Sequence, residues 1–387
     1  MKRRSLVAVL AAGSLVLAAC GDDDDTADEP SEDTTADTEA EEPAEETPDT
    51  TMAEEPAEET PETTMAEEPA EETPETTMAE GDMETPEGWP ESLVLTLTPS
   101  QEAGGLVETA EPLAVALEEA LGIDVEAIVP SDYAGVIVAL QSGQAQIAGG
   151  LGPSQMVQAA DTAGADLILQ SVRFGDSQYV TQWMTNDPAT YCADEPVDVP
   201  DDEGNSMLFC NGVDQATGPS DGPIGEDQLP NVAGQTVSFV DQGSTSGYLI
   251  PSLGLLEAGV DPIEDIETLF AGGHDLSVQA IYDGDATVGV SFNDARGQLV
   301  ETVPDVGEKV VVFGWSSPIP NDGFAVAGDL PDDLKTAITD ALVAYAESED
   351  GAVVMDELYE IDGLVPVPEG SYDIIRNLET ELSDLLG

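Results

Sequence analysis

Basic residues are nearly absent from this 387-residue chain. Lys and Arg together number 8, against 82 Asp and Glu, and the formal net charge is −74. A surface this acidic repels both the phosphate backbone of nucleic acids and anionic lipid headgroups. We therefore exclude nucleic acid as a partner.

Histidine and cysteine are also scarce. The chain has one histidine, His274, and 3 cysteines. Hydrolysis of phosphoryl groups usually needs a metal cluster or a nucleophile activated by a base. A single histidine with no close group of ligands disfavours such chemistry, so we predict no metal, no cofactor and no enzymatic activity.

The first nineteen residues have the pattern of an export signal. Lys2, Arg3 and Arg4 precede an apolar run over 6–17, which is too short for a good transmembrane span. The run ends in Leu-Ala-Ala-Cys20, which resembles the lipobox of bacterial lipoproteins and implies lipidation of Cys20. We expect an extracytoplasmic protein anchored to a membrane. The alternative is a chance cysteine beside an ordinary cleavage site.

Residues 20–91 contain almost only Asp, Glu, Thr, Pro and Ala. They carry too little apolar area to offset chain entropy, which predicts a disordered tether. A unit of thirteen residues, TMAEEPAEETPET, recurs with its methionines at Met52, Met65 and Met78. Its prolines and short period do not fit a solenoid. About seventy such residues give an r.m.s. span of about 45 Å.

Cys192 and Cys210 lie within a stretch over 187–232 that is rich in Asp, Pro, Gly and Asn and that we interpret as an inserted loop. An even pair in an oxidising compartment predicts a disulfide, worth about 3 kcal/mol. Zinc is the weaker alternative, because two thiols and one distant histidine do not supply four ligands.

The remainder, 92–387, has the size of two lobes. Strand patterns alternate with helix patterns, which predicts an α/β fold with mostly parallel sheets. We expect the first lobe at 92–180 and 316–387 and the second at 181–315, with a hinged cleft between them. Strands are expected at 92–100, 123–130, 146–152, 165–173, 235–241, 266–272, 286–292 and 309–315, the last returning to the first lobe. Helices are expected at 109–121, 133–142, 154–163, 246–258, 276–283, 330–347 and 372–386.

Three stretches of the second half, 237–259, 270–296 and 316–326, resemble the phosphate/phosphite/phosphonate substrate-binding proteins of ABC importers. Residues 130–154 agree with that family in a looser pattern. The resemblance implies a two-lobed periplasmic-binding-protein fold of type 2, a small anionic phosphorus-containing ligand and an ABC permease as partner. We expect a monomer that binds without turnover.

The segment 241–248 has the features of an anion site. A strand ends, Gly243 permits a tight turn, and the hydroxyls of Ser244, Thr245 and Ser246 open a helix. Unpaired backbone N–H groups and hydroxyl donors then converge on one point. The alternative is ordinary N-capping by Ser244 or Ser246, which needs one hydroxyl.

Four further residues are candidate ligand contacts. His274 lies where a strand ends and a helix begins, and the matching histidine of the family lies beside the bound oxyanion. Tyr133 matches a ligand-contacting aromatic of the family, and Tyr179 is similarly placed after the last strand of the first lobe. Ser100 lies in the turn that follows Pro99. A structural role remains the alternative for the histidine and for Tyr133.

Two acidic residues complete the set. Asp294 and Asp322 each follow a strand or turn that should face the cleft, and the family uses acids in this region to hold the amine of aminoalkylphosphonates. A carboxylate beside an anion is repulsive unless the ligand brings a cation or an acidic P–OH proton. We therefore expect a ligand other than a simple inorganic dianion. The alternatives are a helix N-cap at Asp294 and a turn at Asp322.

The leading hypothesis is thus a binding lipoprotein that closes on a phosphonate-like anion and delivers it to a permease. A sensing or adhesion lipoprotein with the same fold is the second hypothesis. An extracytoplasmic phosphoester or phosphonate hydrolase is the third.

Overall fold

The computed structural model describes residues 86–101, 103–201 and 203–386, all within one compact unit of the chain, Met78–Gly387. The predicted signal peptide, Cys20 and all but the last residues of the predicted tether lie outside the described residues. Within the described part, no helix is both long enough and apolar enough to cross a membrane.

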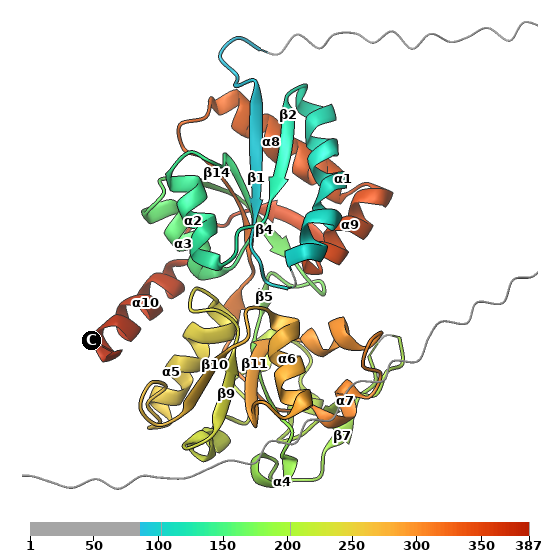
Figure 1. Ribbon diagram of the computed structural model, residues 1–387, viewed down its shortest axis with the longest axis vertical. Coiled ribbons are helices and arrows are strands. Elements are labelled where there is room, and N and C mark those ends of the chain that lie inside the picture. The colour runs from blue at the N-terminus through green and yellow to red at the C-terminus, as the bar shows by residue number, and fades with distance from the viewer. Residues whose placement is uncertain (1–85, 102, 202, 387) are drawn as a thin grey trace, which may run out of the picture. The chain divides into compact units, whose positions relative to one another are not determined.

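The first lobe is built on a six-stranded sheet in the order β15-β4-β14-β3-β1-β2 (Figure 1). Its strands are β1 (Ser92–Leu97), β2 (Asp124–Ile128), β3 (Ile147–Leu151), β4 (Asp166–Val172), β14 (Gly323–Val326) and β15 (Gly363–Pro366). Its helices are α1 (Ala103–Leu121), α2 (Tyr133–Gln141), α3 (Pro153–Asp161), α8 (Asp332–Ala346) and α9 (Glu349–Tyr359). Figure 1 shows α2 and α3 on one face of the sheet and α1, α8 and α9 on the other.

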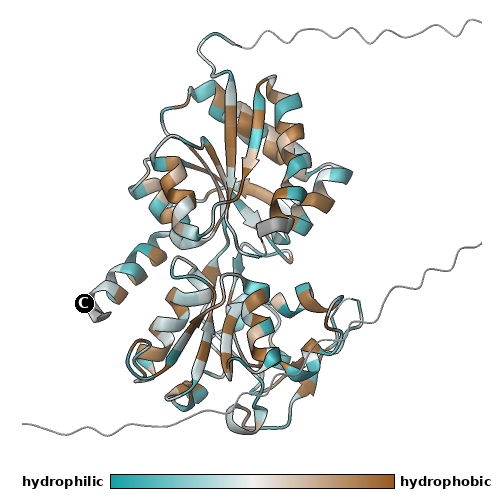
Figure 2. Cartoon of the chain, in the orientation of Figure 1, coloured by the Kyte–Doolittle hydropathy of each residue, from teal (hydrophilic) through white to brown (hydrophobic). Residues whose placement is uncertain are grey.

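Hydrophobic spacing explains the packing of this lobe. Leu106, Leu113, Leu117 and Leu121 recur on one side of α1, and all are buried against β1, α8 and α9. The helix stops at Gly122, whose φ of +66° is readily adopted only by glycine. Figure 2 shows the apolar residues gathered on the strands and on the helix faces turned toward them.

The second lobe is built on a seven-stranded sheet in the order β10-β9-β11-β6-β12-β8-β7. Its strands are β6 (Thr181–Thr185), β7 (Val197–Asp198), β8 (Leu208–Phe209), β9 (Thr236–Phe239), β10 (Glu267–Phe270), β11 (Val288–Phe292) and β12 (Val311–Trp315). Its helices are α4 (Pro188–Tyr191), α5 (Ile250–Glu257), α6 (His274–Asp283) and α7 (Val306–Lys309). Shorter helical turns are η1 (Val213–Gln215), η2 (Pro219–Asp221), η3 (Glu226–Val232), η4 (Thr245–Leu249, a π-helix) and η5 (Ala295–Leu299).

Two short strands lie on the connections between the lobes. β5 (Gln178–Tyr179) and β13 (Ile319–Pro320) pair antiparallel with each other. The C-terminal helix α10 (Asp373–Leu386) contacts both α3 of the first lobe and α5 of the second. The chain therefore crosses between the sheets at 173–180 and 316–322.

The expected return of the strand at 309–315 to the first lobe is wrong. β12 pairs with β6 and β8, and it is β14 that enters the first sheet, between β3 and β4. A buried apolar strand suits either sheet, so its sequence does not specify its neighbours. Each sheet is also mixed, since two of its strands run against the others. Four of the longer elements, β6, β14, α9 and β15, are not among the predicted helices and strands.

The predicted disulfide between Cys192 and Cys210 is confirmed. It holds the loop against β12, where the Cys210 N–H donates to the Val312 carbonyl at 3.0 Å. Tyr191 stacks on Phe313 at 5.0 Å between ring centroids. The insertion is thus fixed to the buried centre of the second sheet.

Candidate ligand-binding site

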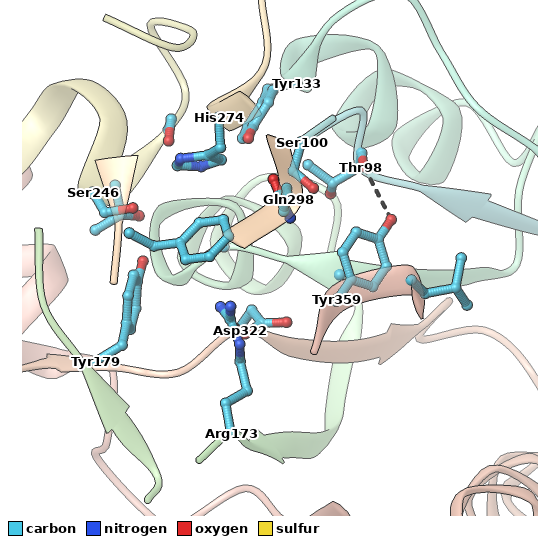
Figure 3. Close-up of a pocket in the computed structure, with 16 residues that line it drawn as sticks. Thr98, Ser100, Tyr133, Arg173, Tyr179, Ser246, His274, Gln298, Asp322 and Tyr359 are labelled. Carbon is cyan, nitrogen blue, oxygen red and sulfur yellow. Dashed lines mark hydrogen bonds and ion pairs between the residues drawn. The ribbon is translucent and has the colours of Figure 1, made fainter. Parts of the chain in front are cut away.

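A cavity of about 50 Å³ lies between the two lobes (Figure 3). A single water needs roughly 10–15 Å³ by the same measure, so the space suits one small molecule. The lining residues come from both lobes and from the connections between them. They are Thr98, Ser100, Tyr133, Gly150, Gly152, Arg173, Tyr179, Ser244, Thr245, Ser246, His274, Phe292, Gln298, Asp322, Leu358 and Tyr359.

The turn after β9 brings its hydroxyls to this cavity. Asp241 fixes the turn: its carboxylate accepts from the Gly243 N–H at 2.7 Å and its carbonyl from the Ser244 N–H at 2.9 Å. A Cβ on Gly247 would lie 2.5 Å from the Val240 side chain, so the close approach requires glycine. The Ser244 hydroxyl accepts from the Gly247 N–H at 3.1 Å, so the capping role is real.

Capping does not account for the other two hydroxyl residues of the turn. Ser244, Thr245 and Ser246 are each 2% exposed, and all three line the cavity. Thr245 Oγ1 accepts from the Ser154 N–H of the first lobe at 2.8 Å, which leaves its own proton free to donate. The Ser246 carbonyl accepts from Thr181 Oγ1 at 3.0 Å. One turn thus supplies three hydroxyl groups and a contact between the lobes.

His274 begins α6 and also joins the lobes, because its backbone N–H donates to the Ser100 carbonyl at 2.8 Å. Its Nδ1 lies 2.8 Å from Ser291 Oγ. Burial, reinforced by the positive charge of Arg173, lowers the pKa of His274 to about 3. The ring is therefore neutral at pH 7. When Nδ1 accepts from Ser291, Nε2 carries the proton and acts as a donor.

Three tyrosines add neutral hydroxyls. Burial raises the pKa of Tyr133, Tyr179 and Tyr359 above the usual range. Figure 3 shows the Tyr179 hydroxyl directed toward Ser246. The Tyr359 hydroxyl donates to the Thr98 carbonyl at 2.9 Å. A Cβ placed on Gly150 would lie only 2.3 Å from the Tyr359 ring. Gly150 also has a φ of +63°, so both backbone and packing require glycine there.

Arg173 is the charged residue of the cavity that the sequence analysis did not predict. It follows β4, is 7% exposed, and its Nη2 pairs with the Glu360 carboxylate at 2.5 Å. The guanidinium lies 4.5 Å from the centroid of the Phe292 ring in the second lobe. Burial opposes its charge, but Glu360 and Asp322 outweigh that effect and raise the pKa of Arg173. The signal in the sequence was the rarity of basic residues. Three of the eight lie in the first four positions, so only five remain for the rest of the chain.

Of the two predicted acidic residues, Asp322 lines the cavity and Asp294 does not. Asp322 is 8% exposed and lines the cavity; its Oδ2 accepts from Ser171, and its Oδ1 lies 3.9 Å from Arg173 Nη1. Asp294 is not brought to this cavity. It caps η5 and pairs with Arg296 at 2.6 Å, which is the N-cap role weighed as its alternative.

A model of the family described as ABC transporter, phosphonate, periplasmic substrate-binding protein matches residues 95–372. The chain belongs to this family. The phosphate-import protein PhnD of Mycolicibacterium smegmatis is 30% identical over 312 residues, covering 76% of this chain and 87% of that protein. Members of the phosphonate-binding family are binding components of transporters, so this chain is not an enzyme.

Solved structures confirm the two-lobed periplasmic-binding-protein fold. PhnD1 of Prochlorococcus marinus, solved with methylphosphonate, superposes with a TM-score of 0.61 at 16% identity, covering 76% of this chain and 99% of that one. A binding component of an ABC phosphonate transporter from Pseudomonas aeruginosa gives 0.60 at 21% identity, with coverages of 74% and 85%. At these identities the likeness establishes the fold alone.

Proposed function

We propose that the protein is an extracytoplasmic lipoprotein that binds a phosphonate-like oxyanion in the cavity between its lobes and delivers it to an ABC permease. Phosphonate, phosphite and phosphate share the tetrahedral chemistry that the cavity suits. The observation that carries the proposal is the convergence of Ser244, Thr245, Ser246 and His274 on one buried space. Phosphate import by the mycobacterial relative and methylphosphonate in the cyanobacterial structure support it.

Each of these donors suits an anion. Hydroxyl and neutral imidazole groups donate hydrogen bonds without needing a counter-ion, and those to an ionised acceptor are about twice as strong as neutral ones. The turn also begins a helix, where backbone N–H groups lack partners within the helix. We propose Ser100, Tyr133, Tyr179, Ser244, Thr245, Ser246, His274 and Asp322 as contacts of the bound ligand.

Closure of the lobes is the step that would complete the site. The bonds from Ser154 to Thr245 and from His274 to Ser100 join the lobes beside the cavity. A ligand that bridges the hydroxyls of one lobe and the tyrosines of the other would favour the closed form through its differential affinity. We propose lobe boundaries at 92–180 with 316–387, and at 181–315.

The anchor and tether would confine the lobes near the permease. A lipid at Cys20 followed by a tether over 20–91 raises the effective concentration of the binding lobes at the membrane. Cys20→Ala should release the protein from the membrane fraction. Retention of this variant in membranes after a carbonate wash would contradict lipid anchoring.

The test of ligand binding uses two serines that make the same cap. Ser244 accepts from the Gly247 N–H at 3.1 Å, and Ser348 accepts from the Gly351 N–H at 3.0 Å at the start of α9. Each Ser→Ala change removes a cap worth about 1 kcal/mol of stability. Only Ser244→Ala should also lower the affinity for methylphosphonate and phosphate, by about tenfold or more, because of the two serines only Ser244 lines the cavity.

Calorimetric titration of the purified full chain measures both effects, with urea unfolding to compare the stabilities. Equal affinities in Ser244→Ala and Ser348→Ala would show that Ser244 is only a cap. Failure of the unaltered chain to bind either anion would overturn the proposed function itself.

A further inference from the structure

Two carboxyl groups stand beside the cavity, and both need a counter-ion. Asp322 lines it directly, while Glu360 lies behind it at the C-terminus of α9. Burial raises the pKa of each, because a buried carboxylate is poorly solvated. Asp322 Oδ1 has no hydrogen-bond partner among the residues that the structure describes. A cation nearby, from the protein or from the ligand, favours the charged form of each carboxyl group.

The protein supplies that cation. Arg173 reaches both acids, with Nη2 at 2.5 Å from Glu360 and Nη1 at 3.9 Å from Asp322. Figure 3 shows the Arg173 side chain beside Asp322. Its planar group rests on the Phe292 ring at 4.5 Å, which fixes its orientation. Asp294 is likewise paired with Arg296. Neither of the two acids that suggested a ligand amine is left without a basic partner.

We propose that Arg173 is a specificity-determining residue, whose guanidinium takes the place that a ligand ammonium would occupy beside Asp322. The site then selects a compact phosphorus oxyanion without an amine, such as phosphate, phosphite or methylphosphonate, over an aminoalkylphosphonate. This inference rests on the proposed function and names the ligand class of the same site.

Charge and volume both act against an aminoalkyl ligand. An ammonium directed at Asp322 would lie beside the guanidinium of Arg173, and like charges in a buried site repel strongly. The cavity of about 50 Å³ is small, so the ethylamine arm of a larger ligand would have to extend beyond the space that holds the tetrahedral group. Binding of a compact oxyanion is favoured instead, because Arg173 attracts its charge while the hydroxyls and His274 donate hydrogen bonds to it.

The decisive experiment compares three ligands on the purified full chain by calorimetric titration: methylphosphonate, phosphate and 2-aminoethylphosphonate. The unaltered chain should bind methylphosphonate about tenfold or more tightly than 2-aminoethylphosphonate. Arg173→Gln should weaken the binding of methylphosphonate by about tenfold or more. It should also narrow or reverse the preference for methylphosphonate over 2-aminoethylphosphonate. Arg376→Gln is the matched control: it removes the same charge from an ion pair with Asp161 outside the cavity, and it should keep the ratio.

Asp322→Asn tests the inference without removing a buried cation. If Arg173 is the counter-ion, this nearly isosteric change removes the repulsion between Asp322 and the anionic ligand. The affinities for methylphosphonate and 2-aminoethylphosphonate should then rise by the same factor. If the ligand amine is the counter-ion, the change selectively weakens 2-aminoethylphosphonate. That selective loss, or tightest binding of 2-aminoethylphosphonate by the unaltered chain, would overturn the inference. Absence of binding to all three ligands would instead overturn the proposed function.

Discussion

An anion in the cavity would meet donors that are mostly uncharged. Burial keeps the tyrosine hydroxyls protonated and His274 neutral, and Arg173 is the one basic residue among those that line the cavity. Neutral donors avoid the cost of desolvating further cations. In a chain of net charge −74, attraction of the ligand must arise within the cavity, because the surface repels anions.

The neutral state of His274 predicts a dependence of stability on pH. Its pKa is about 3 in the folded protein and about 6.5 when unfolded. Between these values only the unfolded chain takes up the proton, so this residue lowers the free energy of unfolding as pH falls from about 6.5 toward 3. His274→Gln should abolish this loss of stability, which amounts to roughly 2–3 kcal/mol of the free energy of unfolding at about pH 4.5.

Urea unfolding of the two proteins at about pH 7 and pH 4.5 measures the effect. The stability difference between the unaltered chain and His274→Gln should shrink at the lower pH, since all carboxyl groups are common to both. A constant difference across that range would mean that His274 keeps its ordinary pKa in the fold.

Residues of the site were predictable where the signal is local. Ser244, Thr245 and Ser246 adjoin in sequence, and a helix start positions them with few contributions from elsewhere. Arg173 and Tyr359 were missed because each has its role through a distant partner, Glu360 in one case and Thr98 in the other. Asp294 lies outside the cavity for a local reason: it caps η5 and pairs with Arg296, two residues further along the chain.

Among the elements, the cysteine insertion is separate from the cavity. Its disulfide closes a loop with a sequence separation of 18 and holds it beside β12 and α4. None of the described residues between Cys192 and Cys210 lines the cavity. The insertion therefore contributes to the stability of the second lobe without contributing a contact to the site.

Replacing Cys192 and Cys210 together by serine should lower the free energy of unfolding by about 3 kcal/mol, mainly because the unfolded chain regains freedom. Affinity for methylphosphonate should stay within about twofold, since this element is remote from the ligand. Urea unfolding and calorimetric titration measure the two quantities. The unaltered chain under a reductant is the control, and a tenfold loss of affinity in the variant would place the loop in the binding mechanism.

The strongly acidic surface of the protein opposes entry of an anion into the cavity. Charges on the surface act over about 30 Å at 0.01 M salt but only about 8 Å at 0.15 M. Affinity for methylphosphonate should therefore rise by about threefold or more as ionic strength increases between these values. Titrations in sodium chloride and in sodium gluconate separate screening from competition by chloride. Affinity that falls with both salts would contradict this expectation.

The sequence alone predicts the α/β class, the disulfide and the positions of most helices and strands, because periodicity, turn residues and cysteine spacing are properties of short segments. It also predicted the hydroxyl turn for that reason. Only the fold shows which sheet each buried strand joins and which cation pairs with the two acids beside the cavity, Asp322 and Glu360. Those outcomes depend on contacts between residues far apart in the chain, such as Arg173 with Glu360 and Asp322, and no local pattern encodes them.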